Sequence, residues 1–479
     1  MPNFPDFRLI AAIGAGKAAG LASRALGRGG GTTLPGVVAR RIAPDTLRRL
    51  SAGLPDGVAV IGGTNGKTTT TRMIAAILQG DGRRVLHNRA GANLVSGLTA
   101  TALAGSSLNG QVHADIGLFE TDEAALPQAL AETRPRLVVL HNLFRDQLDR
   151  YGEVDTIASA WRAALEQLPT NAMVLLNADD PAVAALGETL PTRVFYYGLE
   201  DTRHAGDGAT HFADSQFCRR CGTPYVYSAR FYAHVGHYAC PNCGQRRPAP
   251  DFRLERLDLD GTSGSRLLLS AGARTPLPTA LEISLPLPGL YNALNALAAA
   301  AAGLLLGVAP AHIRTTLEQF SAAFGRIERI DAEGRPLFMA LIKNPVGASE
   351  TVRMLVGAQE SGSTSPSSIL HMLVAINDKY ADGTDVSWLW DADFERLAGH
   401  VASAMVSGTR AGDMAVRLKY AGIDPAQIRS EPDLSRALDA ALAQLPPGAT
   451  LYALPTYTAM LELRAELARR GWVKPFWED

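Results

Sequence analysis

The sequence has almost no net charge and no long uninterrupted apolar run. Its 479 residues include 46 Lys and Arg against 47 Asp and Glu, a formal net charge of -1. Bulk charge therefore predicts neither nucleic acid nor an anionic membrane as a partner. The apolar stretch from Leu9 to Leu26 is interrupted by Lys17 and Arg24, so we expect no membrane span and no signal peptide. We predict a cytoplasmic protein in which this stretch packs on the first globular unit; an amphipathic helix at the inner face of the membrane is the alternative.

Cysteine is scarce, and all four cysteines fall in one short segment. Cys218 and Cys221 form one Cys-x-x-Cys-Gly knuckle, and Cys240 and Cys243 form a second, with 18 residues between the knuckles. Four thiolates at this spacing can close a tetrahedron around Zn²⁺, and disulfides are disfavoured in a cytoplasmic protein. We therefore predict a structural zinc ribbon with no open coordination position.

The cysteine-rich segment leaves two alternatives open. His234 and His237 lie inside the loop and could compete as zinc ligands. Basic residues flank both knuckles, as in ribbons that bind nucleic acid. We prefer the all-cysteine site and predict no nucleic-acid partner, because a phosphate-binding loop elsewhere in the chain indicates a different activity.

Apolar runs alternate with helical patterns on both sides of this segment, which predicts an α/β fold with crossover helices between parallel strands. We predict an N-terminal segment (1–50), an α/β unit (51–320) interrupted by the ribbon insertion (206–250), and a smaller C-terminal Rossmann-like α/β unit (325–479). Strands are expected at Val58–Ile61, Ile116–Phe119, Leu137–Leu140, Val174–Leu176, Val194–Tyr197, Ile369–Ile376, Ala402–Val406 and Thr450–Ala453, and helices at 292–306, 411–420 and 458–470.

A Gly-rich turn follows the first predicted strand and precedes a helix. It consists of Gly63, Thr64, Asn65, Gly66, Lys67, Thr68 and Thr69. Backbone N–H groups of such a turn close around phosphate oxygens, Lys67 supplies a cation to the terminal phosphates, and Thr68 offers a hydroxyl to Mg²⁺. The turn therefore predicts binding of ATP and Mg²⁺, although Ile61 stands where the usual phosphate-loop pattern has glycine.

This turn resembles the phosphate loop of the Mur ligases and folylpolyglutamate synthases, which phosphorylate a carboxylate and then join it to an amine. The resemblance implies a central Mur ligase P-loop ATPase domain that carries the inserted ribbon. It also implies that Glu120 holds Mg²⁺, with Asp122 and Glu123 as competitors. Arg326 resembles the arginine that reaches the phosphates from the far side of the cleft.

Two further segments lie in the order that the Mur ligases use. Asn292 and Asn295 resemble the adenine-contacting residues, and the alternative is that they hydrogen-bond locally on one helix face. The segment Asn177–Pro181 closes a predicted strand in the same fashion; a simple helix N-cap is its structural alternative.

Four longer segments narrow the resemblance. Together with the ribbon, residues 142–153, 343–347, 377–388 and 454–460 resemble the MurT family, the ligase-like subunits of lipid II isoglutaminyl synthase. This implies amidation of the D-glutamate α-carboxyl of lipid II, with ammonia from a GatD-type glutaminase in a heterodimer. It also implies that Asp385, or its rival Asp382, completes the glutaminase site; an Asp-Gly turn is the structural alternative.

Lysine is absent between Lys67 and Lys343. The amino-acid-adding Mur ligases usually carry a carbamoylated lysine in this region, and Ala164 stands near its expected place. An amino-acid-adding Mur or folylpolyglutamate ligase is therefore the weaker interpretation. Lys343 itself could face a phosphate or the substrate carboxylate, or could equally be a surface ammonium.

The cysteine count bears on the source of ammonia. Glutaminases of the common kind need a cysteine nucleophile, and all four cysteines are assigned to zinc, so a partner must supply the ammonia. We expect ATP to phosphorylate the carboxylate and ammonia to attack the acyl phosphate, while Lys67, Mg²⁺ and Arg326 spread the developing charge. An ATP-binding scaffold without activity is the alternative from a different class.

Overall fold

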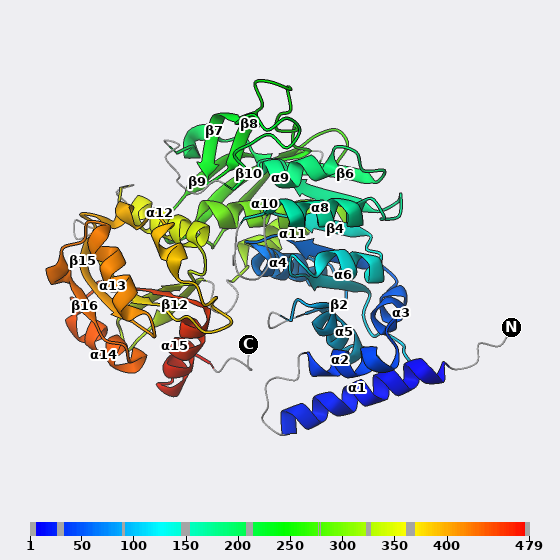
Figure 1. The fold of residues 1–479 in the computed structure, drawn as a ribbon, viewed down its shortest axis with the longest axis horizontal. Coiled ribbons are helices and arrows are strands. Elements are labelled where there is room, and N and C mark those ends of the chain that lie inside the picture. Colours follow the sequence, from blue (N-terminus) through cyan, green and yellow to red (C-terminus); the bar gives the residue numbers. More distant parts are fainter. Residues whose placement is uncertain are drawn as a thin grey trace.

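A computed structural model describes residues 6–25, 33–88, 92–144, 154–206, 214–275, 277, 279–321, 327–360 and 369–474. They form a nine-stranded sheet, a six-stranded sheet and a two-stranded hairpin, surrounded by helices (Figure 1). The six-stranded sheet lies beside the larger one, and the N-terminal helices cover the end of the molecule opposite the hairpin (Figure 1).

The larger sheet has the strand order β11-β10-β9-β6-β5-β4-β1-β3-β2. In this order, the strands from β9 through β6, β5, β4, β1 and β3 to β2 pair in parallel, and β10 and β11 add an antiparallel edge. The bounds are β1 Val58–Gly62, β2 Val85–His87, β3 Ile116–Glu120, β4 Leu137–Leu140, β5 Met173–Asn177, β6 Arg193–Leu199, β9 Phe252–Leu259, β10 Ser265–Ala271 and β11 Leu281–Leu285.

Both faces of this sheet are covered, which explains the continuous apolar runs in its central strands. Successive strand residues point to opposite faces, so Ala59 and Ile61 pack into one core while Val58 and Val60 pack into the other. One face carries α4 (Lys67–Gly80), α10 (Leu290–Leu305) and α11 (Pro310–Glu318); the other carries α2 (Leu34–Ile42), α3 (Thr46–Ala52), α5 (Val95–Ala104), α6 (Leu126–Thr133), α8 (Val154–Leu165) and α9 (Pro181–Ala184).

The N-terminal apolar stretch forms α1 (Phe7–Ala25), which packs on α2 and α5. This is the packing that the sequence favoured over a free surface helix. In the described part of the chain, no helix is long and apolar enough to cross a membrane.

The cysteine-rich insertion lies between β6 and β9, which pair with each other in parallel. Its hairpin consists of β7 (Val226–Tyr232) and β8 (Val235–Ala239), and the short helices η1 (Ala185–Gly187) and η2 (Thr202–His204) lie earlier in the chain. The insertion therefore leaves the larger sheet at one strand and returns to it at the neighbouring one.

The C-terminal sheet has the order β12-β13-β17-β14-β15-β16, and it is parallel except for the β12–β13 pair. Its strands are β12 Ile327–Asp331, β13 Pro336–Ala340, β14 Leu370–Ala375, β15 Val401–Ser407, β16 Ile428–Ser430 and β17 Leu451–Pro455. Its helices are α12 Pro345–Glu360, α13 Ala411–Tyr420, α14 Leu434–Gln444 and α15 Tyr457–Arg469, with the short helices η3 Ser387–Trp390, η4 Phe394–Leu397 and η5 Pro425–Gln427.

The predicted strands and helices are confirmed to within about two residues, which is the usual uncertainty of helix and strand ends. The edge strands β2 and β16 and the hairpin β12–β13 were not predicted from the sequence. The domain limits near residues 50, 320 and 325 stay a prediction; α11 ends at Glu318 and β12 begins at Ile327.

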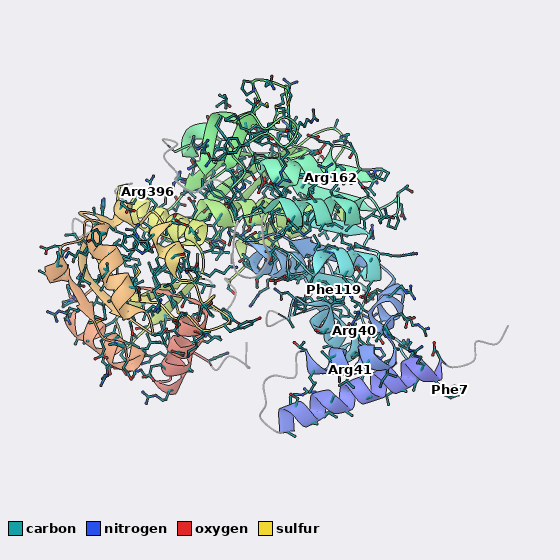
Figure 2. All side chains as sticks on the ribbon, viewed as in Figure 1. Phe7, Arg40, Arg41, Phe119, Arg162 and Arg396 are labelled. Atoms are coloured by element: carbon teal, nitrogen blue, oxygen red, sulfur yellow. The ribbon has the colours of Figure 1, made fainter. Side chains whose placement is uncertain are left out.

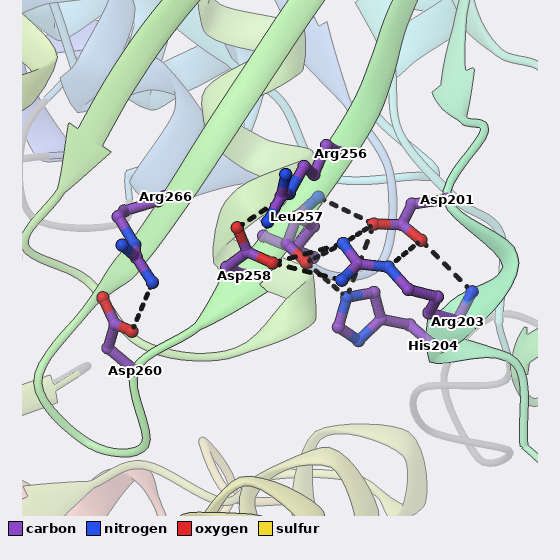
Figure 3. A network of polar contacts seen from close by, with 8 residues as sticks. All are labelled: Asp201, Arg203, His204, Arg256, Leu257, Asp258, Asp260 and Arg266. Atoms are coloured by element: carbon purple, nitrogen blue, oxygen red, sulfur yellow. Dashed lines mark hydrogen bonds and ion pairs between the residues drawn. The ribbon is translucent and has the colours of Figure 1, made fainter. Parts of the chain in front are cut away.

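A polar network fastens η2 to β9 at the base of the insertion (Figure 3). Buried Asp201 accepts hydrogen bonds from the Leu257 backbone N–H at 2.9 Å and from Arg203 Nε at 2.9 Å. Arg203 also contacts Asp258 at 3.2 Å. The hydrogen bond from Arg203 lowers the pKa of Asp201 to about 2. Asp260 lies outside this network, and its side chain makes an exposed ion pair with Arg266 at 3.5 Å (Figure 3).

We expect Asp201→Ala to lower the free energy of unfolding by about 2 kcal/mol at pH 7, because the buried Leu257 N–H loses its acceptor. Since the folded-state pKa of Asp201 lies below its ordinary value, the carboxylate's contribution is present at neutral pH and is lost as the pH falls toward 2. Urea unfolding of wild type and variant at pH 7 and at about pH 3 measures this, and the difference in the free energy of unfolding should be smaller at the lower pH. Asp260→Ala is the matched control, expected within about 0.5 kcal/mol of wild type; equal losses in both variants would contradict the assignment.

Candidate functional site

The phosphate-binding turn lies between the buried end of β1 and the first residue of α4. Gly63 and Gly66 have φ values of 134° and 88°, which favour glycine. A Cβ on Gly66 would lie 2.2 Å from the side-chain oxygen of Asn295, so the turn packs directly against α10. α4 begins at Lys67, so the helix N-terminus adjoins the turn, as in anion sites at helix N-termini.

Lys67 is buried and paired with a carboxylate. Its Nζ lies 2.7 Å from Glu123 Oε1 and also donates to the carbonyls of Gly63 and Thr64. Trp161 Nε1 donates to the Glu123 carbonyl at 2.8 Å and so fixes the position of this residue. An incoming phosphate would compete with Glu123 for the ammonium, because both offer negative oxygens to one buried cation.

The three candidate magnesium ligands after β3 have different neighbours. The Thr68 hydroxyl donates to the Glu120 carboxylate at 3.0 Å. The Asn88 side chain donates to the backbone carbonyl of Glu120 and accepts its backbone N–H, both at 2.9 Å. Adjacent oxygen ligands of an octahedral Mg²⁺ lie about 3 Å apart, so the Thr68–Glu120 pair fits this ion. Glu123 is occupied by Lys67, and Asp122 accepts the Ala124 N–H at 3.1 Å.

A pocket with a cavity volume of about 90 Å³ lies between the phosphate-binding turn and the C-terminal unit. It is lined on one side by Asn65 and α10 residues Asn292 and Asn295, and on the other by Lys343 and Glu350. Asn295 Nδ2 approaches Asn292 Oδ1 at 3.4 Å, and Asn292 donates to the Pro288 carbonyl at 2.8 Å. The two asparagines therefore interact locally and also face the pocket.

The pocket contains a histidine and a tyrosine that sequence reasoning missed. His141 Nδ1 lies 2.9 Å from the Tyr197 hydroxyl. Burial raises the pKa of Tyr197 far above its usual value and lowers the pKa of His141 to about 3, so both groups are neutral. The tyrosine O–H donates to Nδ1 if the imidazole proton is on Nε2, and accepts from Nδ1–H in the other tautomer. His141 Nε2 is buried and has no hydrogen-bond partner among the described residues, so it offers a ligand a donor in the first tautomer and an acceptor in the second.

The positions of these residues relative to the predicted strands could have identified them from the sequence. His141 follows β4, Asn177 ends β5, and Tyr197 lies in β6, so all three stand toward the carboxyl ends of adjacent parallel strands. Ligands of open α/β sheets bind outside those ends. Glu350 comes from α12 instead, and burial raises the pKa of its carboxyl to about 6.

Two of the sequence predictions concern residues that the structure does not describe. Arg326 and residues 145–153 lie outside the described residues. The nearby contact between the two sheets is described: Asn344 Nδ2 donates to Asn65 Oδ1 at 2.9 Å. The C-terminal unit therefore touches the phosphate-binding turn directly.

The two candidate aspartates of the C-terminal unit differ in exposure. Asp382 is buried and accepts the Thr458 N–H at 2.7 Å, so it anchors its loop to the start of α15. Asp385 is exposed, and its carboxylate accepts the Ser387 N–H at 2.8 Å, a hydrogen bond that lowers its pKa. Of the two, Asp385 is the one accessible to another chain.

The four cysteines gather in one cluster, with all four sulfur atoms within 4.8 Å of one another. Cys218 and Cys243 are 3.4 Å apart, as are Cys221 and Cys240. Sulfur ligands of a tetrahedral zinc lie about 3.8 Å apart, so the cluster fits a metal ion of this kind.

The two rival histidines point elsewhere. His234 Nε2 pairs with Asp180 at 3.1 Å, and His237 Nε2 contacts the Leu199 carbonyl at 2.7 Å. Asp180 also caps α9 by accepting the N–H groups of Ala182 and Val183, so the helix-cap alternative for this segment is correct.

The ribbon is fastened to both sheets. Arg247 pairs with buried Asp179 at 2.6 Å and with Glu200 at 2.8 Å. From the C-terminal unit, Arg353 of α12 donates to the carbonyls of Phe231 at 2.6 Å and His204 at 2.7 Å. The insertion thus forms part of the contact between the two units.

Comparisons with known proteins agree with this geometry. The Mur ligase middle domain model matches residues 61–223, and the MurT ligase C-terminal model matches residues 341–460. Two solved structures share the fold. They are a pseudomurein peptide ligase type C from Methanothermus fervidus, with a TM-score of 0.66 and 19% identity over 89% of this chain and 81% of that one, and the MurF ligase from Thermotoga maritima in complex with ADP, with a TM-score of 0.61 and 14% identity over 90% and 85%.

A curated relative matches along nearly the whole length. The MurT subunit of lipid II isoglutaminyl synthase (glutamine-hydrolyzing) from Streptococcus pneumoniae is 35% identical over 462 residues, which cover 96% of this chain and 97% of the relative. The predicted Mur ligase α/β fold is confirmed, as is the presence of a four-cysteine cluster. At this identity and coverage, the chain belongs to the MurT family of Mur ligases.

Proposed function

We propose that this chain is the ATP-using ligase subunit of an enzyme that amidates the D-glutamate α-carboxyl of lipid II to D-isoglutamine. The observation that carries the proposal is the full-length similarity to a subunit named lipid II isoglutaminyl synthase. The phosphate-binding turn, the paired Lys67 and the adjoining pocket supply the features that ATP binding requires.

ATP would place its phosphates on the turn of Gly63 to Gly66, and its base in the pocket lined by Asn292, Asn295 and His141. Lys67 would exchange Glu123 for a phosphate oxygen. Thr68 and Glu120 would hold Mg²⁺, which neutralises phosphate charge when bound. Arg326 keeps its proposed role at the phosphates.

A carboxylate oxygen of the substrate attacks the γ-phosphorus, and ADP leaves. Ammonia then attacks the carbonyl carbon of the acyl phosphate, phosphate departs with the carboxylate oxygen, and a proton is lost to solvent. The chain needs no covalent nucleophile for these steps, because it positions the reactants and stabilises developing charge.

The ammonia comes from a partner in this proposal. All four cysteines lie in one cluster, so the chain has no other thiol for glutamine hydrolysis. The relative is itself named a subunit. A GatD-type glutaminase is our proposed partner, and exposed Asp385 our proposed contact with its histidine. No nucleic-acid partner is proposed.

The absence of lysine between Lys67 and Lys343 weighs against an amino-acid-adding ligase. A lipid-linked substrate would bring the chain to a membrane surface as a peripheral protein. Zn²⁺ is the metal proposed for the cysteine cluster, where four thiolates leave no open position, so it would stabilise the insertion rather than take part in the reaction.

We expect the chain with ATP, Mg²⁺ and ammonium chloride, and without glutaminase, to replace the hydroxyl of the D-glutamate α-carboxyl of lipid II by an amino group. Mass spectrometry of lipid II detects this change. Lys67→Ala should reduce the rate at least about 100-fold because the phosphate charge is no longer compensated, while partner binding persists. Lys419→Ala, an exposed lysine on α13, should leave the rate unchanged. No product with ammonia or with glutaminase and glutamine would refute the proposal.

A second prediction separates the acidic residues after β3. Glu120→Gln should raise the Mg²⁺ concentration for half-maximal ATP hydrolysis by about 10-fold or more, because a metal ligand loses its charge. Asp122→Asn should change this concentration little, since its carboxylate caps a turn. A larger shift in Asp122→Asn would reverse the assignment.

A third prediction concerns the cysteine cluster. Native mass spectrometry should find one zinc per chain, and Cys240→Ser should lose it and expose the hairpin β7–β8 to proteolysis, because the ribbon lacks a core of its own. His237→Gln is the control and should keep the metal, since His237 points to Leu199. Zinc retention in the cysteine variant together with loss in the histidine variant would show that the ligands are misassigned.

A further inference from the structure

The N-terminal helices carry charge of one sign. From Phe7 to Pro44 the sequence contains no Asp or Glu, although the whole chain is nearly neutral. The cations of the described helices are Arg8, Lys17, Arg24, Arg40 and Arg41. A local basic segment of this kind favours an anionic surface even when the net charge does not.

The inner face of α1 is already used. Small residues let the helices approach closely: a Cβ on Gly16 would lie 2.9 Å from Leu103, and one on Gly20 would lie 3.0 Å from Pro35. On α2, a Cβ on Gly36 would collide with the Ser96 carbonyl of α5 at 1.8 Å. Any other partner of α1 must therefore meet its opposite face.

That opposite face is apolar along its whole length. Phe7 is 74% exposed and Leu21 is 64% exposed, and Leu34 at the start of α2 is 46% exposed. Four exposed alanines lie on the same face of α1: Ala11, Ala18, Ala22 and Ala25. They recur at helical spacing, so they form one stripe on the side of α1 away from α2 and α5. Figure 2 shows Phe7 at the outer end of α1.

Three of the five cations are exposed. Lys17 is held by the Ser106 carbonyl and Arg40 by Glu132. Arg8, Arg24 and Arg41 are exposed, and Arg8 Nε also donates to the Ile42 carbonyl at 2.7 Å. An apolar stripe flanked by cations is the composition of a helix that lies in a membrane interface. The acidic side chain at its start, Asp6, accepts the N–H groups of Arg8 and Leu9 and pairs with Arg49, so its charge is compensated.

We propose that the outer face of α1 docks on the surface of an anionic lipid bilayer. The apolar stripe would enter the boundary between headgroups and acyl chains, and Arg8, Arg24 and Arg41 would meet the lipid phosphates. The inference deepens the proposed function, because a lipid-linked substrate lies at such a surface, and bilayer binding can be measured without it.

The same helices connect to the reaction site. α5, which carries the α1–α2 pair, begins just after Asn93, whose carbonyl accepts the Asp122 N–H at 3.1 Å. Asn88, in the same connection from β2, brackets Glu120. A bilayer-bound α1 would thus hold the carboxylates after β3 at a fixed distance from the lipid surface.

The test is flotation of the full chain with vesicles of phosphatidylcholine containing phosphatidylglycerol, compared with vesicles of phosphatidylcholine alone. We expect binding to the anionic vesicles that weakens with added salt. Leu21→Glu and Phe7→Glu should each reduce the bound fraction at least about 10-fold, because a charge replaces an inserted apolar side chain. Arg24→Gln should reduce binding less.

Val416→Glu is the matched control, because Val416 is also an exposed apolar residue on a helix, 47% exposed on α13. It should bind like wild type. The proposal is overturned if wild type does not float, if Leu21→Glu and Val416→Glu behave alike, or if the stripe variants change only self-association in analytical ultracentrifugation, which would make a second copy the occupant. Amidation of detergent-dissolved lipid II with ammonia should survive in Leu21→Glu. If wild type floats with the vesicles but does not amidate lipid II, the proposed function is refuted and the docking proposal is not.

Discussion

A buried ammonium must have an anionic partner, and the site is built around this requirement for Lys67. The turn after β1 places the ammonium below the protein surface, and β3 ends next to it so that Glu123 compensates its charge. Trp161 of α8 holds the backbone of Glu123. Three elements that are distant in sequence thus depend on one charge pair, which keeps Lys67 charged and in place before phosphate arrives.

The pocket beside this pair belongs to two units. The nine-stranded sheet contributes His141 and Tyr197, and the C-terminal unit contributes Lys343 and Glu350. Contacts between the units, among the described residues, include those of Asn344 with the phosphate-binding turn and of Arg353 with the ribbon. The ribbon therefore has a second structural role, because its backbone carbonyls help to position α12, the helix that carries Glu350.

Local patterns were enough to predict the central strands, the phosphate-binding turn and the cysteine cluster. Buried parallel strands are apolar on both faces, and a glycine turn or a pair of cysteine knuckles contains its chemistry within a few residues. The roles of Lys67, Thr68 and Glu120 remain proposals, although their side chains lie where those roles need them.

Other features depend on contacts that no local pattern reports. The choice between Asp382 and Asp385 follows from the position of α15, because Thr458 satisfies Asp382 and leaves Asp385 exposed. Glu350 reaches the pocket from helix α12 of the C-terminal unit, and nothing in its flanking residues marks it as a lining residue. The sequence analysis favoured ordinary packing for the stretch that forms α1. That packing accounts only for the inner side of the helix.

The neutral His141 gives one wall of the pocket a hydrogen-bond pattern that does not titrate. With a pKa of about 3, the imidazole stays neutral at any pH well above that value, so its charge does not change near neutral pH. Glu350 on the opposite wall, with a pKa of about 6, changes charge slightly below neutral pH. Any acid sensitivity of ligand affinity in this pocket would thus be carried by the helix of the C-terminal unit rather than by the sheet that holds the phosphate-binding turn.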